Sequence, residues 1–272
     1  MIVDDRNLDL PEFVKYPKIP YVENYPDIYG SEGYIFEKID GSLSQIRKIN
    51  SGRVVGGSRA NYLTGEKARK SRWMGDFLKW MHNNTSLYNI PENMVIYGEW
   101  LNPISVNYDK ENENKFYFID LAIAEDGKPK FYDYGEAINY LKSWNLDDII
   151  FLDPIKKGFF DDYSIKSLIQ DYEGKLGPEF EGLVLKNYNT EEFAKFLTPK
   201  YSEIRKQAKD IQDKYVTKTR IDKARRRIDD SGVEINLDNL ASEIIQDIVA
   251  ESGVSVDINA VKGVIRVKNL FP

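Results

Sequence analysis

Six ionisable residues lie inside or at the ends of segments that are otherwise apolar, and this pattern constrains the fold more than any other feature of the chain. Three are lysines and three are acids: Lys38, Glu99, Asp120, Glu181, Lys186 and Lys195. A charge in such a place costs several kcal/mol unless it is paired or used. One such residue is usually a structural ion pair, whereas a balanced set predicts a polar cleft between sheets. Lysines in that cleft could hold a polyphosphate, and its carboxylates could hold a cation or a ribose hydroxyl.

The segments around these charges have the short apolar or alternating pattern of strands. We predict strands at residues 33–36, 43–49, 94–100, 115–122, 181–186 and 193–197. We predict helices, from their spacing of apolar residues, at 71–82, 136–144, 164–172, 204–228 and 236–251. Asn236 or Asp238 would cap the last helix and Gly253 would stop it. Residues 1–30 hold four of the eleven prolines and predict an extended arm packed against the body.

Composition excludes several classes of site. The 272 residues include no Cys and one His, so disulfides, thiolate zinc sites and histidine-rich metal sites are ruled out. Any metal would be a hard cation on carboxylates, which favours Mg²⁺ or Mn²⁺. No apolar run reaches the ~18 residues of a membrane span, and no signal-peptide pattern begins the chain. We therefore expect a cytoplasmic enzyme with no membrane partner.

The charge is unevenly distributed along the chain. The net charge is −6, but residues 53–72 carry six basic residues against one acid, and 201–230 carry ten against six. Two basic segments on an acidic body are compatible with a confined site for a polyanion such as nucleic acid. Solvated helix faces would show the same charge runs.

Residues 37–42 place Lys38 at the end of a strand, followed by Asp40 and Gly41. An exposed Asp-Gly turn with a solvated lysine would give the same pattern. Alternatively, Lys38 is a covalent nucleophile, because an amine can bond to phosphorus once its pKa falls from about 10.4.

Five segments in order resemble motifs I, III, IIIa, IV and V of the covalent nucleotidyltransferases, which comprise ATP-dependent ligases and mRNA capping enzymes. They are Lys38-Ile39-Asp40-Gly41, Tyr97-Gly98-Glu99, Phe118-Ile119-Asp120, Glu181 to Lys186, and Ala194-Lys195-Phe196. The run from Lys195 to Glu203 is similar to the RNA ligase branch of that superfamily. The resemblance covers roughly residues 30–203. Any one motif is weak, but five in this order are specific.

The resemblance implies a three-step reaction with ATP as co-substrate. Lys38 would attack the α-phosphorus and release pyrophosphate; the AMP would pass to an RNA 5′-phosphate, and a 3′-hydroxyl would displace it. The catalytic residues would be Lys38, Asp40 and Lys195. The metal would be bound by Glu181 and Asp40. The nucleotide would be bound by Glu37, Lys38, Arg59, Glu99 (ribose), Phe118 (stacked on adenine), and Lys186 and Lys195 (α-phosphate).

Relatives in this superfamily often carry a second motif V lysine, whereas Leu197 holds that place here and Lys200 is the nearest substitute. We expect an α+β fold. Residues 1–203 would form a nucleotidyltransferase domain of antiparallel sheets flanked by helices, and 204–272 a small, mainly helical domain. Its basic residues Arg225, Arg226 and Arg227 would bind nucleic acid. The expected protein is a monomeric ATP-dependent RNA ligase. A minimal DNA ligase and a non-catalytic nucleic-acid-binding protein on the same fold stay open as alternatives.

Overall fold

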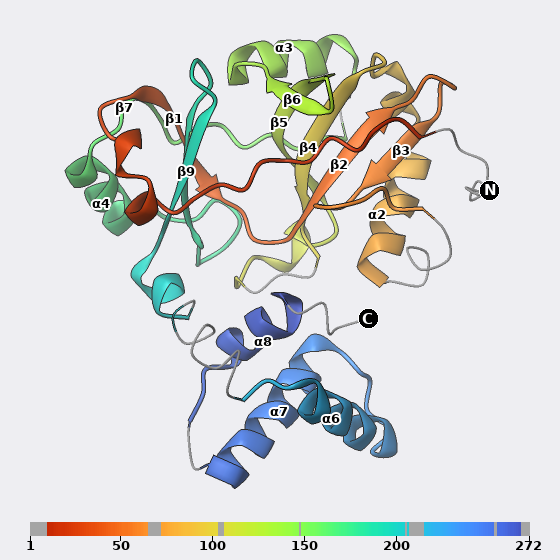
Figure 1. Cartoon of the computed structure of the whole chain (residues 1–272), viewed down its shortest axis with the longest axis vertical. Helices are drawn as coiled ribbons and strands as arrows, with labels where there is room; N and C mark the ends of the chain where they lie inside the picture. Colours follow the sequence, from red (N-terminus) through yellow and green to blue (C-terminus); the bar gives the residue numbers. More distant parts are fainter. Residues whose placement is uncertain are drawn as a thin grey trace. The chain divides into compact units, whose positions relative to one another are not determined.

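The computed structural model describes residues 10–64, 72–102, 106–146, 148–204, 206, 215–252 and 255–267. The chain divides into two compact units, Met1–Phe196 and Leu197–Pro272. The first holds the strands and most of the aromatic core, and the second is helical in its described part (Figure 1). The fold is therefore α+β, as the sequence predicts. The chain divides between residues 196 and 197, whereas the sequence analysis placed the division after residue 203.

The first unit contains two antiparallel sheets. One has the order β7-β1-β8-β9 and the other the order β3-β2-β4-β5-β6. The strands are β1 (Glu32–Lys38), β2 (Ser42–Lys48), β3 (Val54–Gly57), β4 (Met94–Trp100), β5 (Phe116–Glu125), β6 (Lys128–Phe131), β7 (Lys156–Phe159), β8 (Gly182–Asn187) and β9 (Glu192–Leu197). The short link between β1 and β2 crosses from one sheet to the other, and Lys38 is the last residue before it.

Helices of the first unit pack against the faces of these sheets. They are α2 (Arg72–Asn83), α3 (Tyr134–Ser143) and α4 (Asp162–Asp171), with the 3₁₀ turns η2 (Val22–Asn24), η3 (Pro26–Ile28), η4 (Thr85–Asn89) and η5 (Lys110–Asn112). Asp133 and Asp161 cap α3 and α4 by accepting hydrogen bonds from the backbone N–H of Gly135 and Ser164. The three helices that the sequence predicts in this region are confirmed.

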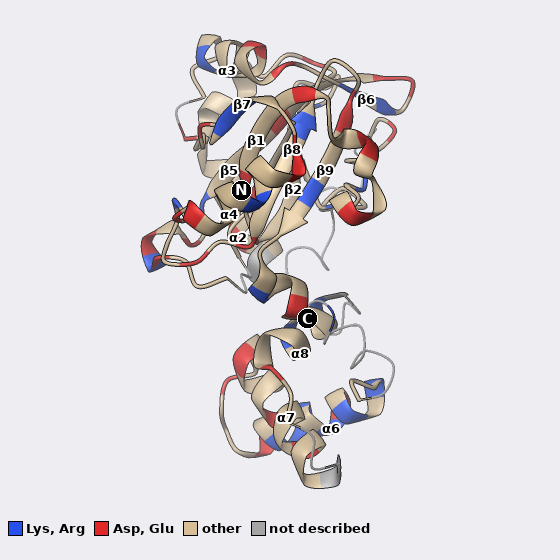
Figure 2. Ribbon diagram, turned by 90° about the vertical axis from the view of Figure 1, so that its left-hand side faces the viewer, with Lys and Arg blue, Asp and Glu red and all other residues tan. Residues whose placement is uncertain are grey.

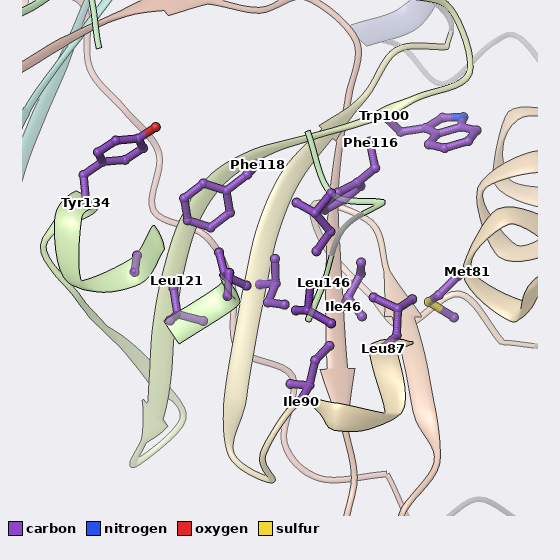
Figure 3. Packing of buried hydrophobic residues seen from close by; sticks show 14 of the residues in the cluster. Ile46, Met81, Leu87, Ile90, Trp100, Phe116, Phe118, Leu121, Tyr134 and Leu146 are labelled. Atoms are coloured by element: carbon purple, nitrogen blue, oxygen red, sulfur yellow. The ribbon is translucent and has the colours of Figure 1, made fainter. Parts of the chain in front are cut away.

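The main hydrophobic core packs α2, α3 and η4 against the five-stranded sheet. It includes Ile46, Phe116 and Phe118 of that sheet with Met81 of α2 and Leu87 of η4, as Figure 3 shows, and Tyr34 of β1 belongs to the same cluster. Helix α4 covers the other face of the four-stranded sheet, where Ile165 and Ile169 meet Ile35, Leu183 and Leu185. Successive side chains of a strand point to opposite faces. Tyr34, Phe36 and Lys38 therefore share the face of β1 that looks toward the second sheet.

The second unit has its own core, formed by α6 (Lys218–Asp230), α7 (Leu237–Ser252) and α8 (Ile258–Val267). The continuous helix expected over 204–228 is wrong. Residues 215–217 are not helical, and Thr217 starts α6 by accepting a hydrogen bond from the Arg220 N–H. Residues 207–214 of that prediction lie outside the described part. Asn236 caps α7 as predicted, accepting from the Asn239 N–H at 2.8 Å, whereas Gly253, its expected stop, is not described.

The N-terminal arm, residues 10–30, crosses one face of the five-stranded sheet, as Figure 1 shows for the red segment. Val14 is buried there beside Val95, Tyr97 and Ala122. The extended, packed arm predicted from its prolines is confirmed for this part, with two 3₁₀ turns added at η2 and η3. No helix in the described ranges is both long and apolar enough to span a membrane.

Candidate active site

The crossover from β1 to β2 brings Lys38 against β4, which carries Glu99. Gly41 permits this approach, because a Cβ added there would lie 2.5 Å from the carbonyl oxygen of Trp100 and 3.0 Å from Cγ of Glu99. A backbone oxygen cannot move aside as a flexible side chain can, so only glycine fits this position. The glycine of the Lys-x-Asp-Gly sequence thus has a packing reason of its own.

The Lys38 ammonium forms an ion pair and hydrogen bond with Oε2 of Glu181, the residue just before β8. The side chains are mostly enclosed, with 21% and 18% of their surfaces exposed. Burial, the largest single influence, acts to lower the pKa of Lys38, but Glu181, Asp40 and Glu99 together outweigh it and the net shift is upward. Lys38 is therefore a charged ammonium in the free protein and must lose a proton before it can act as a nucleophile.

Two further carboxylates act on the same group. Burial raises the pKa of Glu99 to about 8, against the opposing charges of Lys38 and Arg59. Asp40 is held by the loop after β4: its backbone N–H donates to the Tyr108 hydroxyl at 2.9 Å, and its carboxylate accepts from the Val106 N–H at 3.2 Å. Lys38, Asp40, Glu99 and Glu181 thus form one electrostatic cluster, with Arg59 acting on it.

Lys195 joins this cluster from β9, because its charge acts to lower the pKa of Glu181. Its Nζ lies 4.2 Å from the centre of the Tyr21 ring, in cation–π geometry. The remaining lysine, Lys186, forms an ion pair with Asp120, outside this cluster. It is 4% exposed and donates to Asp120 Oδ2 at 2.7 Å and to the carbonyl of Ile119 at 3.0 Å. These bonds use two of the three N–H groups of its ammonium.

Two other predicted nucleotide-binding side chains, Glu37 and Phe118, have partners outside the Lys38 cluster. Glu37 lies on the opposite face of β1 from Lys38, and its Oε2 accepts from the Tyr172 hydroxyl at 2.8 Å and the Lys175 N–H at 2.9 Å. Its other carboxylate oxygen is buried and has no hydrogen-bond partner among the residues that the structure describes, and burial raises the pKa of Glu37. Phe118 is buried in the main core beside Tyr134 and Phe151, with ring centres 6.3 and 5.6 Å away (Figure 3).

The predicted nucleic-acid-binding arginines lie on α6, in the second unit (Figure 2). Arg227 is engaged within the unit: its guanidinium is 3.1 Å from both Glu243 and Asp247 of α7. Asp247 also accepts from Arg220 and Lys223. Arg226 is exposed and Arg225 is half-buried. Arg227 therefore has a packing role that the charge count of the sequence did not indicate.

Sequence reasoning missed three tyrosines that touch the site: Tyr108 on Asp40, Tyr21 on Lys195, and Tyr16, whose hydroxyl donates to Asp120. With 18 tyrosines in the chain, no local pattern marks these three. Their contacts connect residues far apart in the sequence, and only the fold brings them together.

A divalent cation would find carboxylates but no complete cage. No group of three or more His, Asp or Glu positioned to hold a metal occurs in the described residues. Mg²⁺ is commonly held by one or two carboxylates together with substrate phosphates. Glu181 and Asp40 beside Lys38 fit that pattern, because both act on the same ammonium. The residues thus fit a cation that arrives with a polyphosphate.

Comparison with known proteins identifies the family. The model described as RNA ligase matches residues 31–201, which include every motif named above. The chain belongs to the RNA ligase family. No match was found among curated protein sequences.

Solved structures agree on the fold. A Naegleria gruberi RNA ligase with pyrophosphate is 19% identical, with a TM-score of 0.55 over 72% of this chain and 59% of that chain. A lysine-to-alanine variant of that ligase with ATP and Mn is 18% identical with a TM-score of 0.55, covering 72% and 60%. A lysine-to-methionine variant with AMP and Mn is 17% identical with a TM-score of 0.53, covering 72% and 60%. The chain thus spans about 60% of the length of these structures.

Proposed function

We propose that this protein is an ATP-dependent RNA ligase that joins 5′-phosphate and 3′-hydroxyl RNA ends, with Lys38 as its covalent nucleophile. The observation that carries the proposal is the cluster around Lys38: an enclosed amine at a strand end, paired with Glu181 and within the fields of Asp40 and Glu99. Family membership supports the same reading, because the matched region contains this cluster.

In the first step, the neutral Lys38 amine attacks the α-phosphorus of ATP. A nitrogen–phosphorus bond forms, the bond to the β-phosphate oxygen breaks, and pyrophosphate leaves. Lys195, whose charge already acts on Glu181, would offset the charge of the phosphates, and Glu99 would hold the ribose as a hydrogen-bond acceptor. A divalent cation held by Glu181 and Asp40 would neutralise further phosphate charge. If Glu181 binds this cation, Lys38 also loses the ion-pair partner that raises its pKa and keeps it protonated.

In the next steps, the AMP passes from Lys38 to the 5′-phosphate of an RNA end, restoring the amine. A 3′-hydroxyl then attacks that phosphate, a phosphodiester forms, and AMP leaves. A magnesium- or manganese-dependent, monomeric, cytoplasmic enzyme acting in RNA repair is part of the proposal. A DNA ligase or a non-catalytic binding protein would use the same fold, so the substrate panel below includes DNA ends.

The test uses ATP labelled at the α-phosphate. The wild type should form a labelled lysine adduct and seal RNA ends in a panel of nicked and single-stranded RNA and DNA. Lys38→Ala should abolish labelling but still join a pre-adenylylated RNA, since that step needs no free amine. Lys38→Arg should also fail, because a guanidinium stays protonated. Undiminished labelling of either variant would remove Lys38 from this role.

Metal dependence gives an independent check. With no Cys and one His in the chain, Mg²⁺ or Mn²⁺ should be required, and EDTA should stop labelling and sealing alike. Glu181→Ala should lose labelling by at least tenfold, whereas Glu181→Asp should retain part of it. Full labelling of the wild type in EDTA would contradict the assignment of Glu181 and Asp40 to a cation.

A further inference from the structure

The N-terminal arm, residues 10–30, precedes the region that the family model matches, which begins at residue 31. The arm is nevertheless fastened to the catalytic unit. The backbone carbonyl of Val14 accepts from the Gln45 amide at 3.2 Å and from the Tyr97 hydroxyl at 3.0 Å. The Glu12 carbonyl accepts from the Arg47 guanidinium at 3.0 Å. These bonds fix the path of the arm along β2 and β4.

The arm then reaches β9 beside Lys195. The Lys195 N–H donates to the Pro20 carbonyl at 2.9 Å, and Tyr21 pairs with Lys195 as an isolated parallel bridge. The side chains follow the backbone contact, with Lys195 Nζ 4.2 Å from the Tyr21 ring centre. An aromatic face attracts an ammonium without supplying a formal negative charge. It can therefore orient Lys195 while leaving its full charge for a phosphate.

A second tyrosine of the arm meets the other motif lysine indirectly. Asp120 of β5 is buried and accepts from Lys186, from the Tyr188 hydroxyl at 2.6 Å and from the Tyr16 hydroxyl. Lys186 lies on β8, in the four-stranded sheet, and Asp120 in the five-stranded one. The arm thus contacts the ion pair that connects the two sheets.

We propose that the arm is a strap that positions the motif lysines, and that Tyr21 is the positioning residue for Lys195 in phosphate binding. This inference rests on the proposed function for the role of Lys195. It adds to the ligase site a segment that lies outside the matched family region. Tyr16 secures the same strap at Asp120, which fixes the register with which Tyr21 arrives at β9.

Four full-length variants test the strap. Tyr21→Leu removes the aromatic face but keeps an apolar side chain, and Tyr21→Phe keeps the ring. Pentafluorophenylalanine at position 21 keeps the shape of the ring while reversing its electrostatic face, so it tests the contact if the leucine variant folds poorly. Tyr29→Phe is the matched control, since it removes from the same arm a hydroxyl bond to Asp162 that lies away from the cluster.

Tyr21→Leu and the fluorinated variant should lower the rate of Lys38 labelling at saturating ATP by about 3- to 30-fold, the range a desolvated cation–π contact predicts. Tyr21→Phe and Tyr29→Phe should stay within about twofold of wild type. ATP affinity is measured by calorimetry in a Lys38→Ala background, which prevents turnover. There, Tyr21→Leu should weaken affinity, and should have no further effect once Lys195→Met is present.

If the Tyr21→Leu and fluorinated variants label and bind ATP as the wild type does, the proposed role of the arm is wrong. The ligase assignment is not affected by that result. An effect of Tyr21→Leu that persists unchanged beside Lys195→Met would also overturn the proposed role of the arm, because Tyr21 would then act through another residue. If the wild type forms no adduct, the proposed function is wrong, and the role of the arm is then tested by the ATP affinities alone. If the wild type neither labels nor binds ATP, both proposals fall.

Discussion

Burial raises the pKa of Glu99 to about 8, although Lys38 and Arg59 both act to lower it. In the unfolded chain the same group loses its proton near pH 4.3. Between these values the folded state binds one more proton than the unfolded state, so the stability contributed by Glu99 falls as the pH rises through this window. A carboxylate kept in this position at a cost to folding is typical of a functional site.

Glu99→Gln should therefore raise the melting temperature, and more so at pH 8 than at pH 5, because the amide has no proton to lose. The same change should weaken ATP binding, since Glu99 is the proposed acceptor for the ribose. Thermal unfolding at pH 5, 6.5 and 8 checks the first expectation, with the exposed Glu113→Gln as control. An equal gain at every pH would show that the charge of Glu99 does not destabilise the fold.

Individual site residues could be predicted from the sequence where a charge interrupts an apolar strand. Lys38 and Glu181 were predicted in this way, and the structure places them in contact. The partners of Lys186 and Glu37 could not be. An isolated strand gives the alternation of its side chains, but not which loop or strand will lie over each face. For the same reason, the sequence placed Tyr21 and Tyr16 in a packed arm but did not predict their contacts with Lys195 and Asp120.

At the scale of elements, the junction of β4 and β5 depends on Gly98. The register shifts between Tyr97 and Gly98, and the next residue is Glu99. A Cβ at position 98 would lie 2.2 Å from the Phe116 ring and 2.6 Å from the Tyr117 carbonyl oxygen. The glycine therefore lets β5 close on β4 at the irregularity that precedes the site carboxylate.

Gly98→Ala should lower the free energy of unfolding by about 1–3 kcal/mol, as overpacking of a filled core does. Thermal unfolding measures the loss. Gly135→Ala in α3 is the matched control within the same unit, because its new Cβ would meet only Asp133 at an ordinary 3.4 Å. If the two variants unfolded at the same temperature, the close approach at Gly98 would not be a constraint on the fold.

Strands and short amphipathic helices were predictable because burial sets their pattern. β4 has the limits that its apolar run indicates, Met94–Trp100. The helix expected over 204–228 failed because a charged, weakly amphipathic segment carries little information on where a helix begins. Thr217 supplies that start by capping Arg220, and a single threonine in a polar run is easily overlooked. Helix α8, begun by the Asp257 side chain on the Asn259 N–H, was missed for a similar reason.

At the scale of the whole molecule, each unit has a core of its own. The site residues from Lys38 to Lys195 all belong to Met1–Phe196, and the residues of the helical core belong to Leu197–Pro272. A chain ending at Glu203 should therefore still form the Lys38 adduct but seal RNA poorly, if the second unit serves the polynucleotide. Labelling with ATP and sealing of RNA, measured on the same protein, separate these activities. Loss of both together would indicate that the second unit is needed for the first to fold.

The basic helix α6 offers a finer test, because its arginines differ in their surroundings. Arg227 pairs with Glu243 and Asp247, whereas Arg226 is exposed. Each arginine that meets a phosphate releases counterion, so its loss weakens binding across sequences and flattens the salt dependence. Arg226→Glu should therefore reduce RNA affinity and the salt slope without lowering the melting temperature.

Arg227→Glu should instead destabilise the second unit, because it would place a third carboxylate beside Glu243 and Asp247, and Asp247 is itself buried. Filter binding over a range of salt concentrations and thermal unfolding, applied to both variants, give the two readouts. An unchanged salt slope for Arg226→Glu would remove this arginine from RNA binding. The charge excess of α6 would then be explained by the pairs that Arg220, Lys223 and Arg227 make with Asp247.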